Sequence, residues 1–505
     1  MGRAKLGLVP FRLEKFDKGY FPNKFFGEIP DGGSSDLKHV IWYRSALRKI
    51  FGMDRINSAQ AATTRGNGLF YFDVQGDSNR VAVFGNAFYE DVSGTWTDRT
   101  GAVTITDGAD NLWQFINHQQ GANRYLIGVN NVNAPIKWTG SGNAAVLGGS
   151  PPANFGSIAK YHDIIFGSSN ESLYFSDDGD PETWNASKWI IPFEKTITRA
   201  IDNGERLAVF KKESTGSVSG FSYLDFQAEE VSIPNVGCSG RLAATNAFFG
   251  TSNTTVIATV AKDGIWLVDQ AFGSTKIFGE NYFEDLNQAN MHKAICAYSS
   301  LDQLLYVAVP KDTAECDTLL VVDMISGAVW PCPSIHANSI RSMASMKDDS
   351  SNEFIYFVDT NGYAFKFNKS TRNYHTGTAT QSIDARFRTK TYDLQDVHSL
   401  RVPKLLANSD GNWTVTMAVG FGLTNNDGNQ GSINLQDSGD LLGSTFILGA
   451  SILSGSDYIF SVLSNVNAFG RFIHITFTNN SLNEHFNIRK CELDLKRRRK
   501  GSDDK

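Results

Sequence analysis

Four acidic residues stand close together in one short stretch of the chain, beside aromatic side chains. The stretch reads LYFSDDGDPETWN, residues 173–185, and its acids are Asp177, Asp178, Asp180 and Glu182. Closely spaced carboxylates can ligate Ca²⁺, and two of them can serve as the acid and the nucleophile or base of a glycosidase. A third interpretation is a polar turn between two β-strands, because Asp side chains accept hydrogen bonds from nearby backbone amides.

The spacing of these acids does not fit an EF-hand calcium loop. Counted from Asp178, Thr183 occupies the sixth position, where the sharp turn requires glycine. The bidentate glutamate expected near the twelfth position is missing, since that part of the chain is apolar: Trp189, Ile190, Ile191. The sequence therefore favours the turn over the calcium site.

The stretch is also similar to the Asp-box of sialidase-type propellers, Ser-x-Asp-x-Gly-x-x-Trp. It departs from that pattern because Asp180 stands where the glycine belongs. Such a box braces a hairpin and has no catalytic role. We therefore interpret the stretch as a structural or interface motif that orients strands or contacts a neighbouring subunit, with these members: Ser176, Asp177, Asp178, Gly179, Asp180, Pro181, Trp184.

Other motifs for chemistry are missing from the sequence. It contains no Walker A loop, no GxGxxG after a strand and no GxSxG nucleophile elbow. The nine histidines form no HxxxH or HxH pair, and the five cysteines form no CxxC pair. We expect no catalytic residue, metal or cofactor. A glycosidase stays an alternative, because its two carboxylates can come from distant strands about 5–9 Å apart.

The composition is that of a globular protein rich in short strands and turns. The chain has 505 residues, of which 35 are Phe and 46 are Gly, and its net charge is −6. The sequence KRRRK, at Lys496, Arg497, Arg498, Arg499 and Lys500, leaves −11 for the remainder. That balance does not favour general binding to nucleic acid or to an acidic membrane. No apolar run approaches the ~20 residues that cross a bilayer, so we expect no membrane insertion.

A short phrase recurs, in which an aromatic or β-branched strand ends on Asp. It occurs as LFYFD (69–73), LYFSD (173–177), GFSYLD (220–225), GIWLVD (264–269), LLVVD (319–323) and FIYFVD (354–359), with APIKWTG (134–140) in the longest gap. These seven markers repeat about every 48 residues, and Asp-Gly and Asn-Gly pairs indicate hairpins among them. The sequence predicts an all-β protein with a six- or seven-bladed β-propeller over residues 56–378.

The pattern changes on both sides of the propeller. Residues 1–55 are turn-rich and are predicted to form an N-terminal arm, in which 39–52 fits either a strand pair or a short helix. Residues 379–495 alternate apolar and polar positions, which predicts a C-terminal antiparallel β-sandwich with a long loop at 424–440. Residues 496–505 are predicted to be a basic, disordered tail; the alternative is that this tail docks on an acidic partner or on DNA.

Several longer stretches share a pattern of turns and strands with one group of virion proteins. They are FSDDGDPETWNASKWI (175–190), ITRAIDNGERLAVFKKESTGSV (197–218), the segment 29–52, the segment 236–269 and the strands after 382. This pattern resembles the packaged-DNA stabilisation or tail nozzle family of short-tailed bacteriophages. The resemblance covers most of the chain and carries no catalytic residue. The loop at 424–440 and the basic end depart from it.

The resemblance implies a structural protein of the virion tail that is made in the cytoplasm of an infected bacterium. It implies a homo-hexamer below the portal and head–tail adaptor, with tail fibres or a needle as further contacts. Double-stranded DNA would pass through the ring, which would retain the packaged genome and release it during ejection. Two alternatives remain at this point: a receptor-binding tail adhesin and, less favoured, a propeller-type glycosidase.

Overall fold

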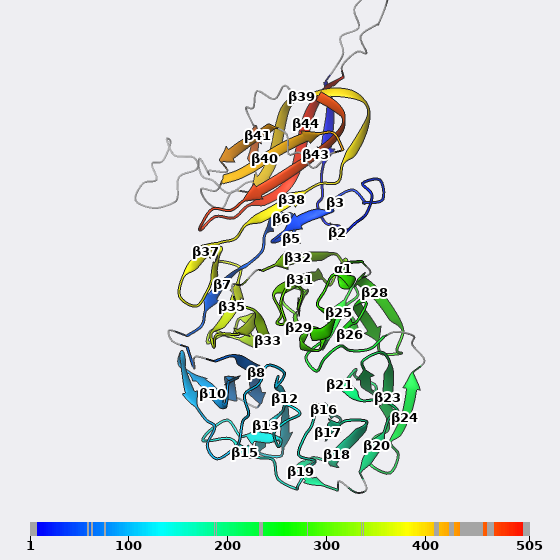
Figure 1. Cartoon of the computed structure of the whole chain (residues 1–505), viewed down its shortest axis with the longest axis vertical. Coiled ribbons are helices and arrows are strands. Elements are labelled where there is room, and N and C mark those ends of the chain that lie inside the picture. Colours follow the sequence, from blue (N-terminus) through cyan, green and yellow to red (C-terminus); the bar gives the residue numbers. More distant parts are fainter. Residues whose placement is uncertain are drawn as a thin grey trace, which may run out of the picture.

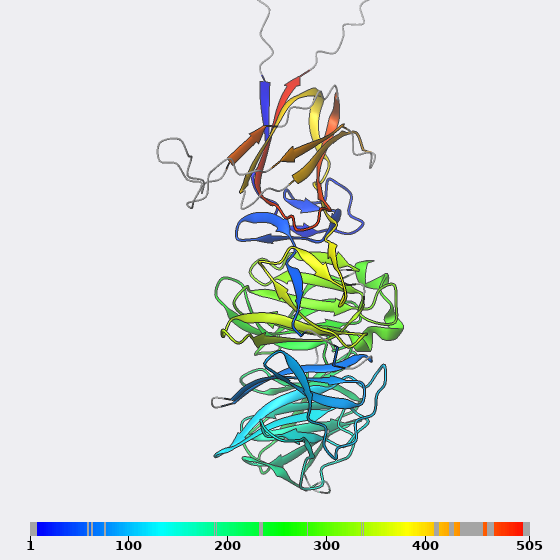
Figure 2. The same cartoon turned by 90° about the vertical axis from the view of Figure 1, so that its left-hand side faces the viewer.

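The fold consists of a β-propeller and a second β-sheet beside it (Figure 1). The computed structural model describes residues 8–57, 60–61, 64–74, 77–185, 187, 189–231, 236–279, 281–334, 336, 338–408, 414–423, 429–434, 458–461 and 469–497. Figure 1 looks along the propeller axis, and Figure 2 shows the propeller edge-on. The second sheet lies at the rim of the propeller, beside blades 6 and 7, and leaves both ends of the axis uncovered.

The propeller has seven blades, each with four main antiparallel strands. Blade 1 contains β8 (Gly66–Val74), β9 (Asp77–Phe84), β10 (Ala87–Val92) and β11 (Thr95–Asp98), and blade 2 contains β12 (Gln114–Gln120), β13 (Asn123–Val129), β14 (Ile136–Trp138) and β15 (Ala145–Val146). Blade 3 contains β16 (Ser157–Tyr161), β17 (Ile164–Ser169), β18 (Ser172–Asp177) and β19 (Asp180–Trp184), with β20 (Ile190–Pro192) added to β18. Blade 4 contains β21 (Ile197–Asp202), β22 (Leu207–Lys211), β23 (Thr215–Ser219) and β24 (Gln227–Val231).

The remaining blades follow the same order. Blade 5 contains β25 (Ala244–Phe249), β26 (Thr254–Ala261), β27 (Gly264–Asp269) and β28 (Ser274–Gly279), and blade 6 contains β29 (Ile295–Ser299), β30 (Leu304–Val309), β31 (Thr318–Asp323) and β32 (Val329–Pro333). Blade 7 contains β33 (Ile340–Lys347), β34 (Glu353–Asp359), β35 (Ala364–Asn368) and β7 (Gly52–Arg55). A short α1 (Asn281–Glu284) and a 3-10 helix (Gln288–Lys293) connect blades 5 and 6.

Strand β7 closes the ring from the N-terminal side of the chain. Its residues pair with β35, with Arg55 opposite Phe365 and Gly52 opposite Asn368. The innermost strands also meet, since β33 of blade 7 packs against β8 of blade 1. Closure covers the apolar faces that the first and last blades of an open arc would leave exposed. The predicted boundary at residue 55/56 is therefore wrong, because Gly52–Arg55 belongs to the propeller.

The prediction of a propeller is confirmed, and the number of blades is seven. The recurring phrase, however, does not mark the same strand in each blade. It falls on the third strand in β14, β18, β27 and β31, but on the innermost strand β8 and on the second strand β34. The reason is that neighbouring blades cover a strand on both faces, as in β30, where all six residues are buried. Apolar runs therefore arise at several strand positions.

One occurrence of the phrase was wrongly interpreted as a strand. GFSYLD, residues 220–225, is a loop between β23 and β24. The carboxylate of Asp225 accepts hydrogen bonds from the backbone amides of Phe221 and Ser222, and Gly220 has φ +117°. These local bonds turn the chain back on itself and replace the ladder of a strand.

The second sheet joins both ends of the chain. Its strands are β1 (Leu8–Leu13), β4 (Asp36–Lys38), β5 (Val40–Tyr43), β6 (Ala46–Lys49), β38 (Ala385–Arg388), β39 (Tyr392–Asn408), β40 (Thr414–Phe421), β41 (Asn429–Asn434), β42 (Tyr458–Ser461), β43 (Phe469–Asn479) and β44 (Asn487–Arg497). Two small pairs accompany it: β2 (Gly19–Tyr20) with β3 (Gly33–Ser34), and β36 (Asn373–His375) with β37 (Thr380–Ser382). Strands β1 and β44 lie side by side at the end farthest from the propeller (Figure 2).

The segment expected to be an arm contributes strands to this sheet. Strand β4 pairs with β38, β6 pairs with β44, and the 39–52 region forms the strand pair β5–β6 and not a helix. The loop prediction at 424–440 is wrong in part, because β41 pairs with β40, while 424–428 and 435–440 lie outside the described residues. The described strands form one hydrogen-bonded sheet, and the sandwich stays a prediction.

A single hydrophobic core runs from blades 6 and 7 into the second sheet. Buried side chains of the blades, such as Trp330 and Phe357, belong to the same cluster as Phe387, Phe477 and Leu493 of the sheet. Each of these five side chains is fully buried. A shared core of this kind holds two parts of a chain as one body, whereas separate cores joined by a linker permit relative motion.

Within the described part of the chain, no helix has both the length and the apolar character needed to cross a membrane.

Candidate subunit interface

The acidic stretch forms the hairpin between β18 and β19 in blade 3. Asp177 pairs with Asp180, and the two residues between them, Asp178 and Gly179, make the turn. Gly179 has φ +68°, a left-handed conformation that glycine adopts without the clash of a Cβ atom. The predicted turn between two strands is confirmed.

Two of the carboxylates bond to the backbone of the hairpin itself. Asp177 accepts a hydrogen bond from the backbone N–H of Asp178, and Asp180 accepts one from the N–H of Glu182. The hydroxyl of Thr183 also donates to Asp180 at 2.8 Å. Asp177 and Asp180 therefore stabilise the turn. No group of three or more His, Cys, Asp or Glu suited to a metal ion occurs among the described residues.

Glu182 joins blade 3 to blade 2. Both of its carboxylate oxygens accept hydrogen bonds from Nζ of Lys137, at 2.6 and 2.7 Å, and Oε1 also accepts from the backbone N–H of Gly148 at 2.9 Å. Lys137 lies on β14 and Gly148 follows β15, so the contact crosses between blades. The two side chains are about three-quarters shielded from solvent, which strengthens the ion pair relative to one on the open surface.

We expect Glu182→Gln to lower the free energy of unfolding by about 1 kcal/mol, because the amide loses a charged acceptor for Lys137 and Gly148. Urea unfolding of the purified protein measures the change. Asp178→Asn is the matched control, since Asp178 is exposed at the tip of the same hairpin. Equal losses for the two variants would contradict the role of the ion pair.

Ser176 and Trp184, two other residues of the motif, hold the hairpin against the rest of blade 3. The hydroxyl oxygen of Ser176, which is 1% exposed, accepts a hydrogen bond from the N–H of Ile165 on β17. The indole N–H of Trp184 donates to the carbonyl of Pro181 at 2.8 Å, and the ring packs 5.4 Å from that of Phe155. The motif is thus a brace within and between blades, and its contact with another subunit stays a prediction.

The loop 220–226 presents an apolar surface to solvent. Phe221 is 74% exposed, Tyr223 55% and Leu224 81%. Hydrogen bonds from Ser222 and Phe221 to the carboxylate hold the turn and lower the pKa of Asp225. We call Phe221, Tyr223 and Leu224 the apolar loop of blade 4. Sequence reasoning missed this surface, although the Gly220 and Ser222…Asp225 spacing is a turn signal.

Two aromatic contacts hold the apolar loop in place. The ring of Phe221 lies 4.9 Å from His162, and that of Tyr223 lies 5.9 Å from Trp189. The loop is therefore ordered before any partner binds. Preorganised apolar side chains lose little conformational entropy on binding, which favours a protein contact at this site.

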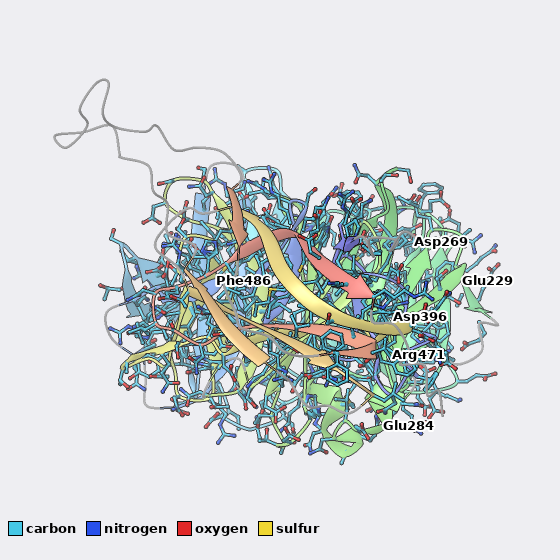
Figure 3. The ribbon with its side chains drawn as sticks, turned by 90° about the horizontal axis from the view of Figure 1, so that it is seen from above. Glu229, Asp269, Glu284, Asp396, Arg471 and Phe486 are labelled. Carbon is cyan, nitrogen blue, oxygen red and sulfur yellow. The ribbon has the colours of Figure 1, made fainter. Side chains whose placement is uncertain are left out.

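The basic stretch is partly ordered. Lys496 and Arg497 are the last residues of β44, where Lys496 lies opposite Leu8 of β1. Arg497 forms a 2.5 Å ion pair with Asp396, and Arg471 pairs with Asp393 nearby. Figure 3 shows Asp396 and Arg471 side by side at one end of the second sheet. The prediction of disorder is wrong for these two residues, because strands flank β44 on both sides, while Arg498, Arg499 and Lys500 lie outside the described residues.

His39 marks the junction between the propeller and the second sheet. Its Nε2 lies 2.7 Å from the carbonyl oxygen of Pro333 in β32, and its Nδ1 lies 2.8 Å from that of Asp384 beside β38. Burial lowers the pKa of His39 from 6.5 to about 4, against the opposing effect of the two carbonyls. A neutral ring donates to only one carbonyl, so protonation would satisfy both at the cost of a buried charge.

The lowered pKa of His39 predicts an acid-sensitive junction. The stability that comes from a depressed histidine pKa is present above the unfolded value of 6.5 and is lost as the pH falls towards 4. We expect the protein to lose about 2–3 kcal/mol more stability than His39→Gln between pH 7 and 4. Unfolding midpoints across this pH range test the prediction, and parallel pH profiles for the two proteins would exclude it.

Comparisons with known proteins give the fold alone. Neither a protein-family model nor a curated protein matches the chain. The solved structure of virginiamycin B lyase from Staphylococcus aureus is 11% identical, with 63% of this chain and 98% of that chain covered and a TM-score of 0.41. The WD40 domain of Neurospora crassa Pan2 is 9% identical, with 63% and 95% covered and a TM-score of 0.40. Similarity at this level carries no argument about function.

Proposed function

We propose that the protein is a structural, non-enzymatic subunit of the tail nozzle of a short-tailed bacteriophage. Six copies form a ring below the portal and head–tail adaptor, and the ring closes the DNA channel until ejection. The observation that carries the proposal is the continuous core between propeller and second sheet, in a chain whose sequence resembles that family. A wall that resists the pressure of packaged DNA needs subunits that do not bend between their parts.

Polar contacts within the second sheet and between it and the propeller support this rigid body. Nζ of Lys49 on β6 donates to the side chain of Asn479 and to the backbone carbonyl of Glu484, which fixes the N-terminal strand to the β43–β44 turn. Tyr43 on β5 donates to Asp302 of blade 6 at 2.7 Å. A single domain with buried contacts of this kind unfolds as a unit, and relative motion of its parts is costly.

The apolar loop of blade 4 supplies the proposed contact with the next subunit. It lies on the side of the propeller opposite blade 7, so a head-to-tail ring can use it without displacing the second sheet (Figure 1). Glu229, which Figure 3 labels, lies on β24 directly after this loop, where it would contribute to a polar rim. An apolar centre with a polar rim is typical of specific protein interfaces.

In the proposed ring, DNA passes between the subunits and not through a propeller. The described hollows near the axis have volumes of about 330 and 180 Å³; the inner strands line the larger one, and mostly segments between strands line the smaller one. A duplex does not fit such spaces. The proposal therefore requires a ring of several copies, and a monomer in the virion would contradict it.

Particles assembled without this protein test the function. We expect heads that fill with DNA, then lose it, and tails that lack their lower part in electron micrographs. Particles that keep their DNA and a complete tail but fail to adsorb would instead indicate the adhesin. Hydrolysis of a sialoside or pentoside by the purified protein, abolished by a change at Asp177, Asp178, Asp180 or Glu182, would indicate the glycosidase.

A further inference from the structure

The propeller axis contains a pocket of about 330 Å³ formed by the inner strands. Blades 1, 2, 4, 5, 6 and 7 contribute to it, and the second sheet does not cover it (Figure 1). Its lining combines aromatic rings with amides and hydroxyls, among them Phe70, Phe115, Asn246, Tyr298 and Ser342. A concave site of about 300–1,000 Å³ with apolar walls and a few polar groups is typical of small-molecule binding.

One cation faces this pocket. Arg199 lies on β21, the innermost strand of blade 4, directly after an irregularity in the pairing with β22 between Ile197 and Arg199. Such bulges redirect a side chain relative to the regular alternation of a strand. The Nε and Nη1 atoms of Arg199 are shielded from solvent and have no hydrogen-bond partner among the described residues.

No acidic group described near Arg199 balances its charge. The titratable groups that influence it are the thiols of Cys238 and Cys296, and burial raises the pKa of both, so they are neutral. Burial lowers the pKa of Arg199 to about 10, which still leaves the guanidinium charged at neutral pH. The one carboxylate in the pocket lining, Asp73, pairs with Lys347 at 3.4 Å.

Arg341, which is buried near the axis, shows the usual arrangement. Its guanidinium donates to the carboxylate of Glu315, the side chain of Asn67 and the carbonyl of Ala109. A buried cation without such partners is costly, and water can satisfy its hydrogen bonds but not its charge. Arg199 therefore has the features of a binding group and not of a structural brace.

We propose that the axial pocket binds a small molecule through a carboxylate or phosphate group that pairs with Arg199. A planar guanidinium donates two parallel hydrogen bonds to such an anion. Trp113 supplies a second buried donor in the same lining, since its Nε1 has no partner among the described residues. The aromatic walls would cover the apolar part of the molecule. This site is independent of the proposed role in the tail.

Thermal unfolding and calorimetry with benzoate, benzamide and inorganic phosphate test the site at constant ionic strength. Benzoate and benzamide have nearly the same shape, and only benzoate carries the charge. We expect benzoate or phosphate, but not benzamide, to raise the melting temperature in a saturable way. A response to benzoate alone would identify an organic carboxylate, and one to phosphate alone a phosphorylated ligand.

The matched variants are Arg199→Met and Arg206→Met. Arg206 pairs with Glu229 at the surface of the same blade. Arg206→Met therefore also removes one positive charge, but at a position outside the axial pocket. We expect Arg199→Met to weaken anion binding at least tenfold and Arg206→Met to leave it unchanged. If Arg199→Met does not fold, Arg199→Lys keeps the charge, loses the two parallel donors and should still weaken binding. The proposal would be overturned if the unchanged protein and the Arg199 variant responded equally to the anions. It would also be overturned if neither anion raised the melting temperature of the unchanged protein.

Discussion

Replacing Arg341 with alanine is expected to lower the free energy of unfolding by about 3–5 kcal/mol. Arg341 is 1% exposed on β33 of blade 7, and its guanidinium reaches Glu315 of blade 6 and Asn67 of blade 1. It thereby connects three consecutive blades at the point where the ring closes. Removal of the cation leaves one oxygen of the partly buried Glu315 carboxylate and backbone carbonyls without the donor that Arg341 supplies, which costs more than the lost contacts alone.

Chemical unfolding of the purified Arg341→Ala protein measures this loss. Arg206→Ala is the control, because the pair with Glu229 is exposed and such pairs contribute about 0–1 kcal/mol. A loss for Arg341→Ala as small as that of the control would show that strand pairing alone closes the ring. Lys293 donates to the other oxygen of Glu315 at 3.0 Å, so this carboxylate keeps one cationic partner in the Arg341→Ala protein.

A propeller of six or seven blades was predictable because the repeated hairpin signals are local patterns. Asp-Gly and Asn-Gly pairs mark hairpins, and Lys262-Asp263 and Asn361-Gly362 indeed separate paired strands. The same patterns did not predict which strand of each blade carries the recurring phrase. Strands inside a blade are covered on both faces, so the alternation that identifies a strand's position is replaced by continuous apolar runs.

The organisation of the chain ends could not be read from one sequence. Strand β7 pairs with β35 and β1 pairs with β44, so the partners are hundreds of residues apart. Short strands such as Asp36–Lys38 carry no recognisable pattern of their own, and their position is decided by the sheet that they join. The predicted arm was for this reason assigned as a separate part.

For the site, the sequence predicted the local geometry but not the long-range contacts. The Asp-Gly pair and Pro181 were sufficient to identify the turn at 177–182. The partner of Glu182 is Lys137, 45 positions earlier and in another blade, which no local pattern reveals. The apolar loop was missed for a related reason, since FSYL has the composition of a buried strand and only the bonds to Asp225 show that it is exposed.

The double variant Phe221→Ser, Leu224→Ser is expected to convert the ring into monomers. Residues that anchor an interface contribute about 2 kcal/mol or more each, so two such losses weaken association about a thousandfold. The fold should be unaffected, because both side chains are mostly exposed. Sedimentation velocity of the purified protein measures the oligomeric state, with Leu301→Ser as the control at an exposed apolar position of blade 6.

The two possible results have different consequences for the proposed nozzle. Monomers in the double variant, with the ring retained in Leu301→Ser, would place the contact between subunits on blade 4 and leave the second sheet available for other tail proteins. A ring that persists in the double variant would remove the apolar loop from the interface. The contact would then have to involve another surface, and the exposed side chains would require a different partner, because ordered apolar residues of this size are rarely left uncovered.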